Sequence, residues 1–107
     1  TDAEWTVLID YLGGELVAGG KMKSTGTQYW SSPNTDATNE SGFSGLPGGY
    51  RLLDGSFYYI GTLGYWWCSS EDGTGIAWYR FLRYYDGGVY RYSNFEKHGY
   101  SVRCLRD

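Results

Sequence analysis

Residues 76–85 constrain the fold more than any other segment, because their side chains alternate and glycine-rich turns bound them on both sides. The two alternating sets are Ala77, Tyr79 and Phe81, and Trp78, Arg80 and Leu82. Such alternation is typical of a β-strand. Gly73 and Gly75 before the segment and Asp86-Gly87-Gly88 after it indicate turns. The segment is therefore expected to lie in an antiparallel sheet.

Short extended segments with similar turn signals make up much of the remaining chain. Asp54-Gly55 is a strong hairpin signal between two of them. The other expected strands are residues 17–23, 50–53, 56–61, 64–70, 89–92 and 100–105, the last of which closes the sheet. The rest of residues 15–49 is expected to be mostly irregular.

The N-terminal residues have the pattern of an amphipathic helix. Thr1 or Asp2 can cap it, and Gly13-Gly14 ends it. Its apolar positions are Trp5, Leu8, Ile9 and Leu12. Their spacing places them on one face, so we expect Trp5 to anchor the helix on the core rather than to stack on a ligand. A helix followed by a mainly antiparallel sheet with long loops is an α+β arrangement, and residues 1–107 are expected to form one domain.

The composition argues against two classes of function. No apolar run approaches the ~18 residues needed to span a bilayer, so direct membrane insertion is not expected. The net charge of −3 argues against a nucleic-acid partner, although basic and aromatic residues interleave near the C-terminal end. Aromatic residues make up 20% of the chain, and large rigid rings suit a binding surface.

Cys68 and Cys104 permit either one disulfide or two free thiols, and the sequence leaves both alternatives open. Neither lies in a C-x-x-C motif, so a redox or metal role is not expected. Residues 34–41 are rich in side-chain oxygens, but they lack the spacing of an EF-hand calcium loop. We interpret them as a loop held by its own side-chain hydrogen bonds, and we expect no metal site and no cofactor.

Several longer motifs follow one another along the whole chain. They are Asp2-Ala3-Glu4-Trp5, Gly19-Gly20-Lys21-Met22-Lys23, Trp30, Pro33-Asn34, Ala37-Thr38-Asn39-Glu40-Ser41-Gly42-Phe43-Ser44, Leu46-Pro47-Gly48-Gly49-Tyr50-Arg51, Gly55, Phe57, Trp66-Trp67, Ser69-Ser70-Glu71, Ala77, Leu82, Val89, Arg91, Lys97 and residues 99–107. In order and spacing they resemble the Fibrobacter succinogenes major paralogous domain, called FISUMP.

The resemblance implies an exported or surface-attached bacterial protein, as in Bacteroidetes and Fibrobacter. It also implies the C-type lectin-like fold in the version shared with formylglycine-generating enzyme. Such domains serve as variable proteins of diversity-generating retroelements, whose mutagenic copying varies adenine-coded positions near the C-terminus.

The chain departs from the family in two places. Family members carry a Gly-Trp-His-Leu-Pro-like segment before the helix, whereas the printed sequence starts after it. We therefore expect the family's N-terminal strand to be missing. Cys68 stands where the family often has Ser.

The resemblance implies that the C-terminal third displays variable side chains on a stiff frame. The frame is Trp66, Trp67, Ala77, Leu82, Val89 and the final strand. The residues expected to contact a ligand are Asp72, Thr74, Ile76, Trp78, Arg80, Arg83, Tyr84, Tyr85, Asp86, Tyr90, Tyr92, Ser93, Asn94, Phe95, Glu96 and His98. Their rings supply contact area and their polar groups supply hydrogen bonds. The alternative is that alternate members form the inner face of the sheet, which is our interpretation of Tyr79 and Phe81.

No catalytic constellation stands out, so we do not expect an enzyme. His98 is the only histidine, and there is no Ser-His-Asp set with evident spacing and no H-E-x-x-H motif. We interpret the chain as a non-catalytic recognition domain for a protein ligand. The alternatives are a glycan-binding module and a structural module of the cell surface or a fimbria. The sequence leaves the oligomeric state open.

Overall fold

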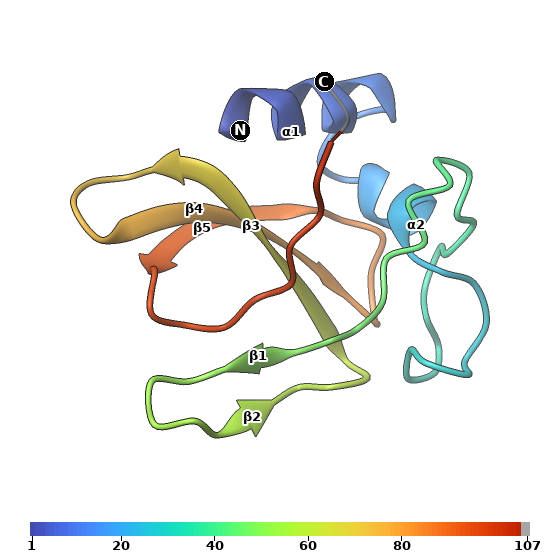
Figure 1. Cartoon of the computed structure of the whole chain (residues 1–107). Coiled ribbons are helices and arrows are strands. Elements are labelled where there is room, and N and C mark those ends of the chain that lie inside the picture. The colour runs from blue at the N-terminus through green and yellow to red at the C-terminus, as the bar shows by residue number, and fades with distance from the viewer. Residues whose placement is uncertain (106–107) are drawn as a thin grey trace.

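The computed structural model describes residues 1–105, which form a helical layer over one face of a three-stranded sheet (Figure 1). In chain order the elements are α1 (Asp2–Tyr11), α2 (Ala18–Met22), β1 (Tyr50–Arg51), β2 (Phe57–Tyr58), β3 (Leu63–Glu71), β4 (Ile76–Arg83) and β5 (Tyr90–Phe95). The three-stranded sheet has the order β3-β4-β5, and β1 and β2 form a separate hairpin. All strand pairs are antiparallel. The predicted α+β class is therefore confirmed.

Helix α1 begins as its sequence predicts. The Thr1 hydroxyl accepts a hydrogen bond from the Glu4 amide at 3.2 Å, and the Glu4 side chain completes a capping box. Ile9 and Leu12 are buried, while Trp5 and Leu8 pack partly buried against the same core. The expectation that Trp5 anchors the helix on the core is confirmed.

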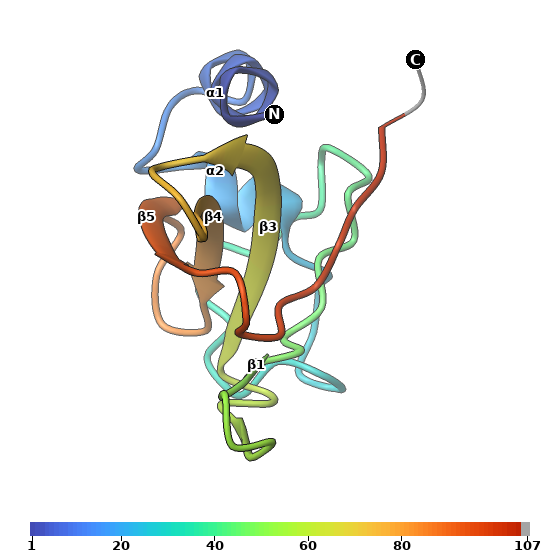
Figure 2. The ribbon, with the colours of Figure 1, turned by 60° about the vertical axis from the view of Figure 1, so that its left-hand side comes forward.

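The core lies between α1, α2 and the near face of the sheet. Its buried members are Ile9, Leu12, Ala18, Met22, Trp30, Trp66, Leu82 and Val89. Trp66 lies opposite Arg80 in the β3-β4 pair, and Leu82 lies opposite Gly64. In Figure 2, α1 lies at one end of the molecule and the β1-β2 hairpin at the other, with β3 running between them. No helix within residues 1–105 is both long and apolar enough to span a membrane.

The predicted strand at residues 17–23 is wrong, because residues 18–22 form helix α2. Burial here is continuous rather than alternating: Ala18, Gly19 and Gly20 are all buried. The glycines are required by close approach. A Cβ on Gly19 would lie 2.0 Å from the Gly88 carbonyl oxygen, and the Gly20 amide donates to the Gly87 carbonyl at 3.1 Å. Tertiary packing therefore decides this segment.

The predicted closing strand at residues 100–105 is also wrong over most of its length. Ser101 forms a single parallel bridge to Trp66, and Gly99 bridges to Arg51. Beyond Ser101, Val102 and Leu105 are exposed, at 71% and 67%. Since no neighbouring strand continues beside them in residues 1–105, there is no ladder for them to join. Residues 106 and 107 of the matched C-terminal motif lie outside the described part.

Candidate functional site

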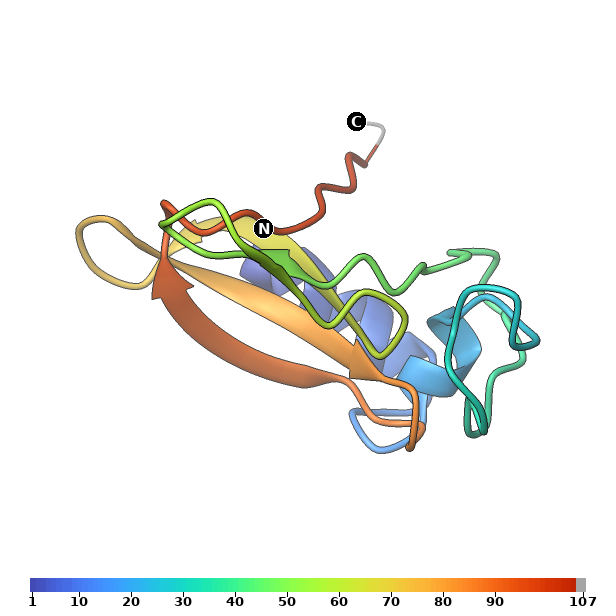
Figure 3. The ribbon, with the colours of Figure 1, turned by 90° about the horizontal axis from the view of Figure 1, so that it is seen from below.

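The face of the β3-β4-β5 sheet that points away from α1 carries a layer of aromatic side chains, which we call the aromatic face. Its members are Tyr65, Trp67, Tyr79, Phe81, Tyr90 and Tyr92, with Tyr100 packed against them. The ring centroids of Phe81 and Tyr90 lie 5.0 Å apart, and those of Trp67 and Tyr100 lie 4.2 Å apart. Figure 3 looks at this side, with α1 behind the sheet, and most of β4 (orange) and β5 (red-orange) is left uncovered.

Strand register brings these rings together. Phe81 lies opposite both Tyr65 and Tyr90, and Tyr79 lies opposite both Trp67 and Tyr92. Opposite residues in an antiparallel pair share a face. Tyr79 and Phe81 therefore do not form the inner face, and that interpretation is wrong. The short helix α1 has one apolar stripe and covers only the other face of the sheet.

The β1-β2 hairpin extends the aromatic face along β3. Tyr50 meets Tyr65 edge-on at 5.2 Å, while Tyr58 and Tyr59 are 46% and 53% exposed. An open depression of about 480 Å³ lies at this end of the sheet. Its lining is Tyr59, Thr62, Leu63, Tyr65, Phe81, Arg83, Tyr84 and Tyr85. The surface thus combines flat rings with one shallow recess.

Four of the predicted contact residues meet beside this depression. The Asp86 carboxylate accepts hydrogen bonds from Arg83 Nε at 2.9 Å and from the Tyr90 hydroxyl at 2.8 Å. The Arg83 guanidinium also lies over the rings of Tyr85 and Tyr90, at 4.6 and 4.0 Å. Burial alone would raise the pKa of Asp86, but the hydrogen bonds from Tyr90, Gly88 and Arg83 outweigh it and lower the pKa. The cluster is charged but internally neutralised.

Burial raises the pKa of several tyrosine hydroxyls of the aromatic face further above neutral pH. It raises the pKa of Tyr79 to about 12, with the neighbouring Tyr100 adding to the shift. Burial likewise raises the pKa of Tyr65 and of Tyr90. At neutral pH these groups are uncharged hydrogen-bond donors and acceptors. The face therefore offers contact area and neutral polar groups at once.

The opposite end of the face collects two more predicted residues, Asn94 and His98, and Phe95 borders it from the end of β5. The Asn94 amide donates to the Tyr100 hydroxyl at 3.1 Å. Phe95 stacks on His98 with centroids 6.5 Å apart, and His98 lies 6.2 Å from Tyr100. Phe95 is 57% exposed. Asn94 and His98 are therefore continuous with the aromatic face through Tyr100, whereas Phe95 lies opposite Ile76 and touches the face only through His98.

Strand register places five predicted contact residues on the α1 side of the sheet, away from the aromatic face: Ile76, Trp78, Arg80, Ser93 and Phe95. Two of them are covered by other side chains. Arg80 is 2% exposed and pairs with Asp2 at 2.8 Å, so it holds α1 on β4 and cannot reach a ligand. Trp78 is covered by the Arg91 guanidinium at 3.5 Å. Asp72 and Thr74 are exposed near the β3-β4 turn, and Glu96 is exposed just after β5. The structure does not bring these three onto the aromatic face.

Side-chain hydrogen bonds hold residues 34–41 both locally and to the rest of the chain. The Ser44 amide donates to Asn39 Oδ1 at 2.8 Å, and the Phe43 amide donates to the Ser41 hydroxyl at 3.1 Å, as the interpretation of a loop held by its own side chains predicts. Asn34 Nδ2 instead donates to the carbonyls of Ser24 and Gly26, outside the loop, at 3.0 and 2.7 Å. That interpretation is therefore confirmed in part.

Comparison with family models settles which family this is. The model described as the Fibrobacter succinogenes major domain matches residues 1–106. The chain belongs to that family. Searches of curated proteins and of solved structures give no match. In this member of the Fibrobacter succinogenes major domain family, the motifs compared above are spread over α1, α2, the loops before β1 and the sheet.

The ion pairs of Asp2 predict a loss of stability of this family domain in acid. Its pKa falls from 3.8 to about 2, chiefly through the hydrogen bond from Arg91 and also through Arg80, with burial opposing. Because the folded-state pKa lies below the unfolded-state value, the stabilisation is present above about pH 4 and is lost as pH falls towards 2. We expect the urea midpoint to fall steeply over this window, and less steeply in Asp2→Asn. If the urea midpoint fell equally steeply with pH in the two proteins, this prediction would be wrong.

The two cysteines of this family domain are free, Cys68 buried and Cys104 exposed. Burial raises the pKa of the Cys68 thiol, which lowers its reactivity. We expect Ellman's reagent to modify one thiol within minutes and the second only on unfolding. The fast reaction should disappear in Cys104→Ser and persist in Cys68→Ser. A native protein with no reactive thiol would indicate the disulfide instead.

Proposed function

We propose that the chain is a non-catalytic recognition domain that binds a protein ligand through the aromatic face. The observation that carries this is a continuous layer of rings with exposed members: Tyr92 on the face is 56% exposed, and Tyr85 beside it is 50% exposed. The other rings of the face are half-buried, except Tyr65, which is buried. A contiguous aromatic patch that reaches the surface is typical of an interaction site. Tyrosine rings beside an arginine are also the composition of protein-binding hot spots. The Arg83-Asp86-Tyr90 cluster adds polar groups in a fixed geometry.

We also propose that the frame is C-type lectin-like and that the parent protein is exported or attached to the bacterial cell surface. Membership of the family supports both. On this proposal a retroelement varies the displayed side chains. Sibling gene copies would then differ mainly at adenine-containing codons between Cys68 and His98, beside a reverse transcriptase and a template repeat. Siblings that differ evenly along the chain would contradict the retroelement.

The alternative ligand is a glycan, which the exposed flat rings of Tyr58, Tyr59 and Tyr92 favour, because sugar rings stack on aromatic faces. Trp78 is a poor candidate for such stacking, since Arg91 covers it. Saturable, salt-insensitive binding on a glycan array that is lost in Tyr92→Ala would support the glycan in place of the protein.

The protein ligand is tested by selecting phage-displayed protein domains on the immobilised chain and measuring the Kd of the selected domains. We expect Tyr92→Ser and Tyr85→Ser to weaken binding by about tenfold or more, the effect of losing a hot-spot ring. Tyr11→Ser and Tyr29→Ser are the matched controls, because both residues are exposed, at 86% and 57%, and lie outside the aromatic face. Equal losses in the controls, or none in Tyr92→Ser and Tyr85→Ser, would contradict the proposal.

A further inference from the structure

Strand β5 is the outer strand of the three-stranded sheet. It pairs with β4 from Tyr90 to Phe95, and no other strand of residues 1–105 lies along its far side. An outer strand presents unpaired N–H and C=O groups, which can pair with another extended chain. Proteins often block such edges with a proline or a lysine, but β5 contains neither.

The direction of each backbone group on β5 follows from two hydrogen bonds. The Val89 amide donates outward to the Glu15 carbonyl at 2.7 Å, and the Glu96 amide donates to the Gly75 carbonyl in the β3-β4 turn at 3.0 Å. In a strand, every second residue points its backbone groups the same way. Arg91 and Ser93 therefore direct their N–H and C=O groups away from β4.

The free part of the edge is short and bounded at both ends. Just before β5, the loop between α1 and α2 already pairs with the edge, because the Glu15 carbonyl accepts a hydrogen bond from the Val89 amide. At the other end the Phe95 amide donates to Asn94 Oδ1 at 2.8 Å. The edge thus offers backbone partners over three residues, Arg91 to Ser93. The Arg91 side chain does not obstruct it, because its guanidinium pairs with Asp2 at 2.8 Å.

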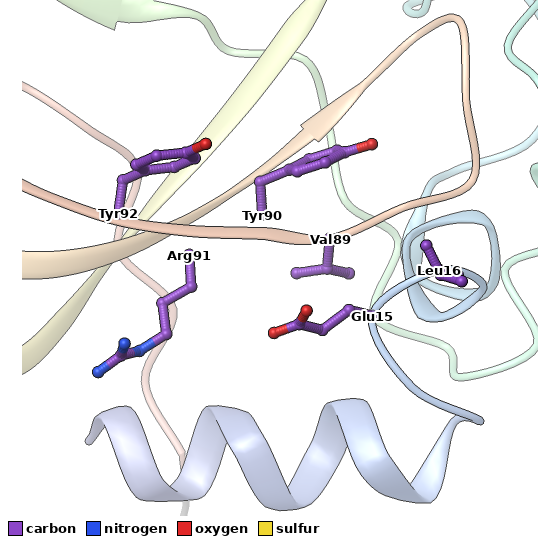
Figure 4. Close-up of a pocket in the computed structure, with 6 residues that line it drawn as sticks. All are labelled: Glu15, Leu16, Val89, Tyr90, Arg91 and Tyr92. Carbon is purple, nitrogen blue, oxygen red and sulfur yellow. The ribbon is translucent and has the colours of Figure 1, made fainter.

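A depression of about 310 Å³ follows this edge and indicates what could lie there (Figure 4). It is lined by Glu15, Leu16, Val89, Tyr90, Arg91 and Tyr92. Glu15 and Arg91 project on the α1 side of β5, and the rings of Tyr90 and Tyr92 project on the other side. Glu15 is exposed and has no ion-pair partner within residues 1–105.

We propose that an extended segment of the protein ligand, with a lysine or arginine between two apolar residues, adds to β5 at Arg91 and Ser93. The residue opposite Arg91 would share its face and lie beside the Glu15 carboxylate. The residues on either side of it would lie next to Tyr90 and Tyr92. Asp2 already pairs with the Arg91 guanidinium at 2.8 Å, so the Glu15 carboxylate, unpaired within residues 1–105, selects the basic residue, and the rings select its apolar neighbours. This inference rests on the proposed function and names the form in which the ligand binds.

A second copy of the chain fits this edge poorly. Antiparallel self-pairing that uses the free groups of both copies sets Arg91 opposite Ser93. The same register sets Val89 opposite Phe95, where the Glu15 carbonyl already holds the Val89 amide. It also brings Glu96 of each copy towards Glu15 of the other, and like charges disfavour that contact. The edge therefore suits a foreign segment better than its own β5.

The test uses the whole chain, labelled with ¹⁵N, and the capped peptide Thr-Val-Lys-Val-Thr as the probe. At 90% occupancy we expect the amides of Arg91 and Ser93 to exchange with solvent about tenfold more slowly, because only the tenth of the molecules without bound peptide can exchange them. Ser93→Pro, which removes an outward N–H, should abolish saturable binding, whereas Ser93→Ala should retain it.

Two further probes do not depend on the folding of Ser93→Pro. The same peptide N-methylated on its central lysine should not bind the unmodified chain. Glu15→Gln should weaken the lysine peptide about two- to fivefold and leave a norleucine peptide unchanged.

Three outcomes would overturn the inference. The peptide could protect neither amide, it could bind equally well when N-methylated, or the chain could form a dimer that Ser93→Pro disrupts. A selected protein ligand that needs Tyr92 but tolerates Ser93→Pro would leave the proposed function standing and remove the strand pairing alone. A ligand insensitive to both the Tyr92 and Tyr85 variants would remove the proposed function itself.

Discussion

Asp2→Ala is expected to lower the free energy of unfolding by about 3–5 kcal/mol, the usual cost of leaving a buried charge without its partner. Arg80 is 2% exposed, and its Nη1 lies 2.8 Å from Asp2 Oδ1. Its remaining side-chain contacts are weak: Thr6 Oγ1 lies at 3.4 Å and Cys68 Sγ at 3.5 Å. Urea unfolding followed by tryptophan fluorescence measures the loss.

Two further variants separate the buried ion pair from the exposed one. Arg91→Met removes the other partner of Asp2, but Arg91 is 38% exposed, so we expect a loss of about 1 kcal/mol or less. Adding Arg80→Met to Asp2→Ala should restore part of the stability, because it removes the orphaned charge. A double variant less stable than Asp2→Ala, or equal losses in Asp2→Ala and Arg91→Met, would contradict this account.

Lys23→Met is expected to destabilise the chain by about 3 kcal/mol, since it leaves buried carbonyl groups without a donor. Lys23 has no exposed surface. Its ammonium donates to the carbonyls of Thr35, Arg83 and Asp86 at 2.7, 3.0 and 3.0 Å. Burial lowers the pKa of Lys23, and the charges of Asp86 and Asp36 oppose that shift. The side chain thus joins α2 to the loop that carries the Arg83-Asp86-Tyr90 cluster.

This role of Lys23 makes a local prediction beyond global stability. Lys23→Met should speed up solvent exchange of the amides of residues 84–89 by a larger factor than that of the α1 amides, because the loop loses its support. Lys21→Met is the matched control, because Lys21 lies two residues earlier, within α2, and donates none of these bonds. A loss below about 1 kcal/mol for Lys23→Met, or uniform acceleration of exchange, would show that the ammonium does not position the loop.

The sequence predicted the sheet better than it predicted the two faces of the sheet. The strands at β3, β4 and β5 follow from alternation and glycine turns, and the cap of α1 follows from Thr1 and Glu4. The face assignment failed because both alternating sets of β4 contain large side chains, so the pattern alone does not say which set is buried. The signal that could have decided it is the matching phase of Tyr65 and Trp67 in β3.

The remaining errors have tertiary causes. Arg80 has the residue type of a binding hot spot, but its partner Asp2 is 78 positions away in the sequence, and only the fold brings them together. Residues 18–22 are helical because Gly19 and Gly20 pack closely on residues 87–88 and 36, a contact that local propensity does not encode. Of the predicted contact residues, Tyr90, Tyr92 and Asn94 lie on the aromatic face, and Arg83, Tyr85, Asp86 and His98 border it, while Tyr84 lines the depression and packs against the core.

Hydroxyl-radical footprinting of the chain with and without a selected protein ligand tests the central claim most directly, because it reports which rings the ligand covers. The account predicts strong protection of Tyr85 and Tyr92, with Tyr11 and Tyr29 modified equally in both states. Protection centred on Tyr11, with Tyr85 and Tyr92 still fully modified in the complex, would contradict it.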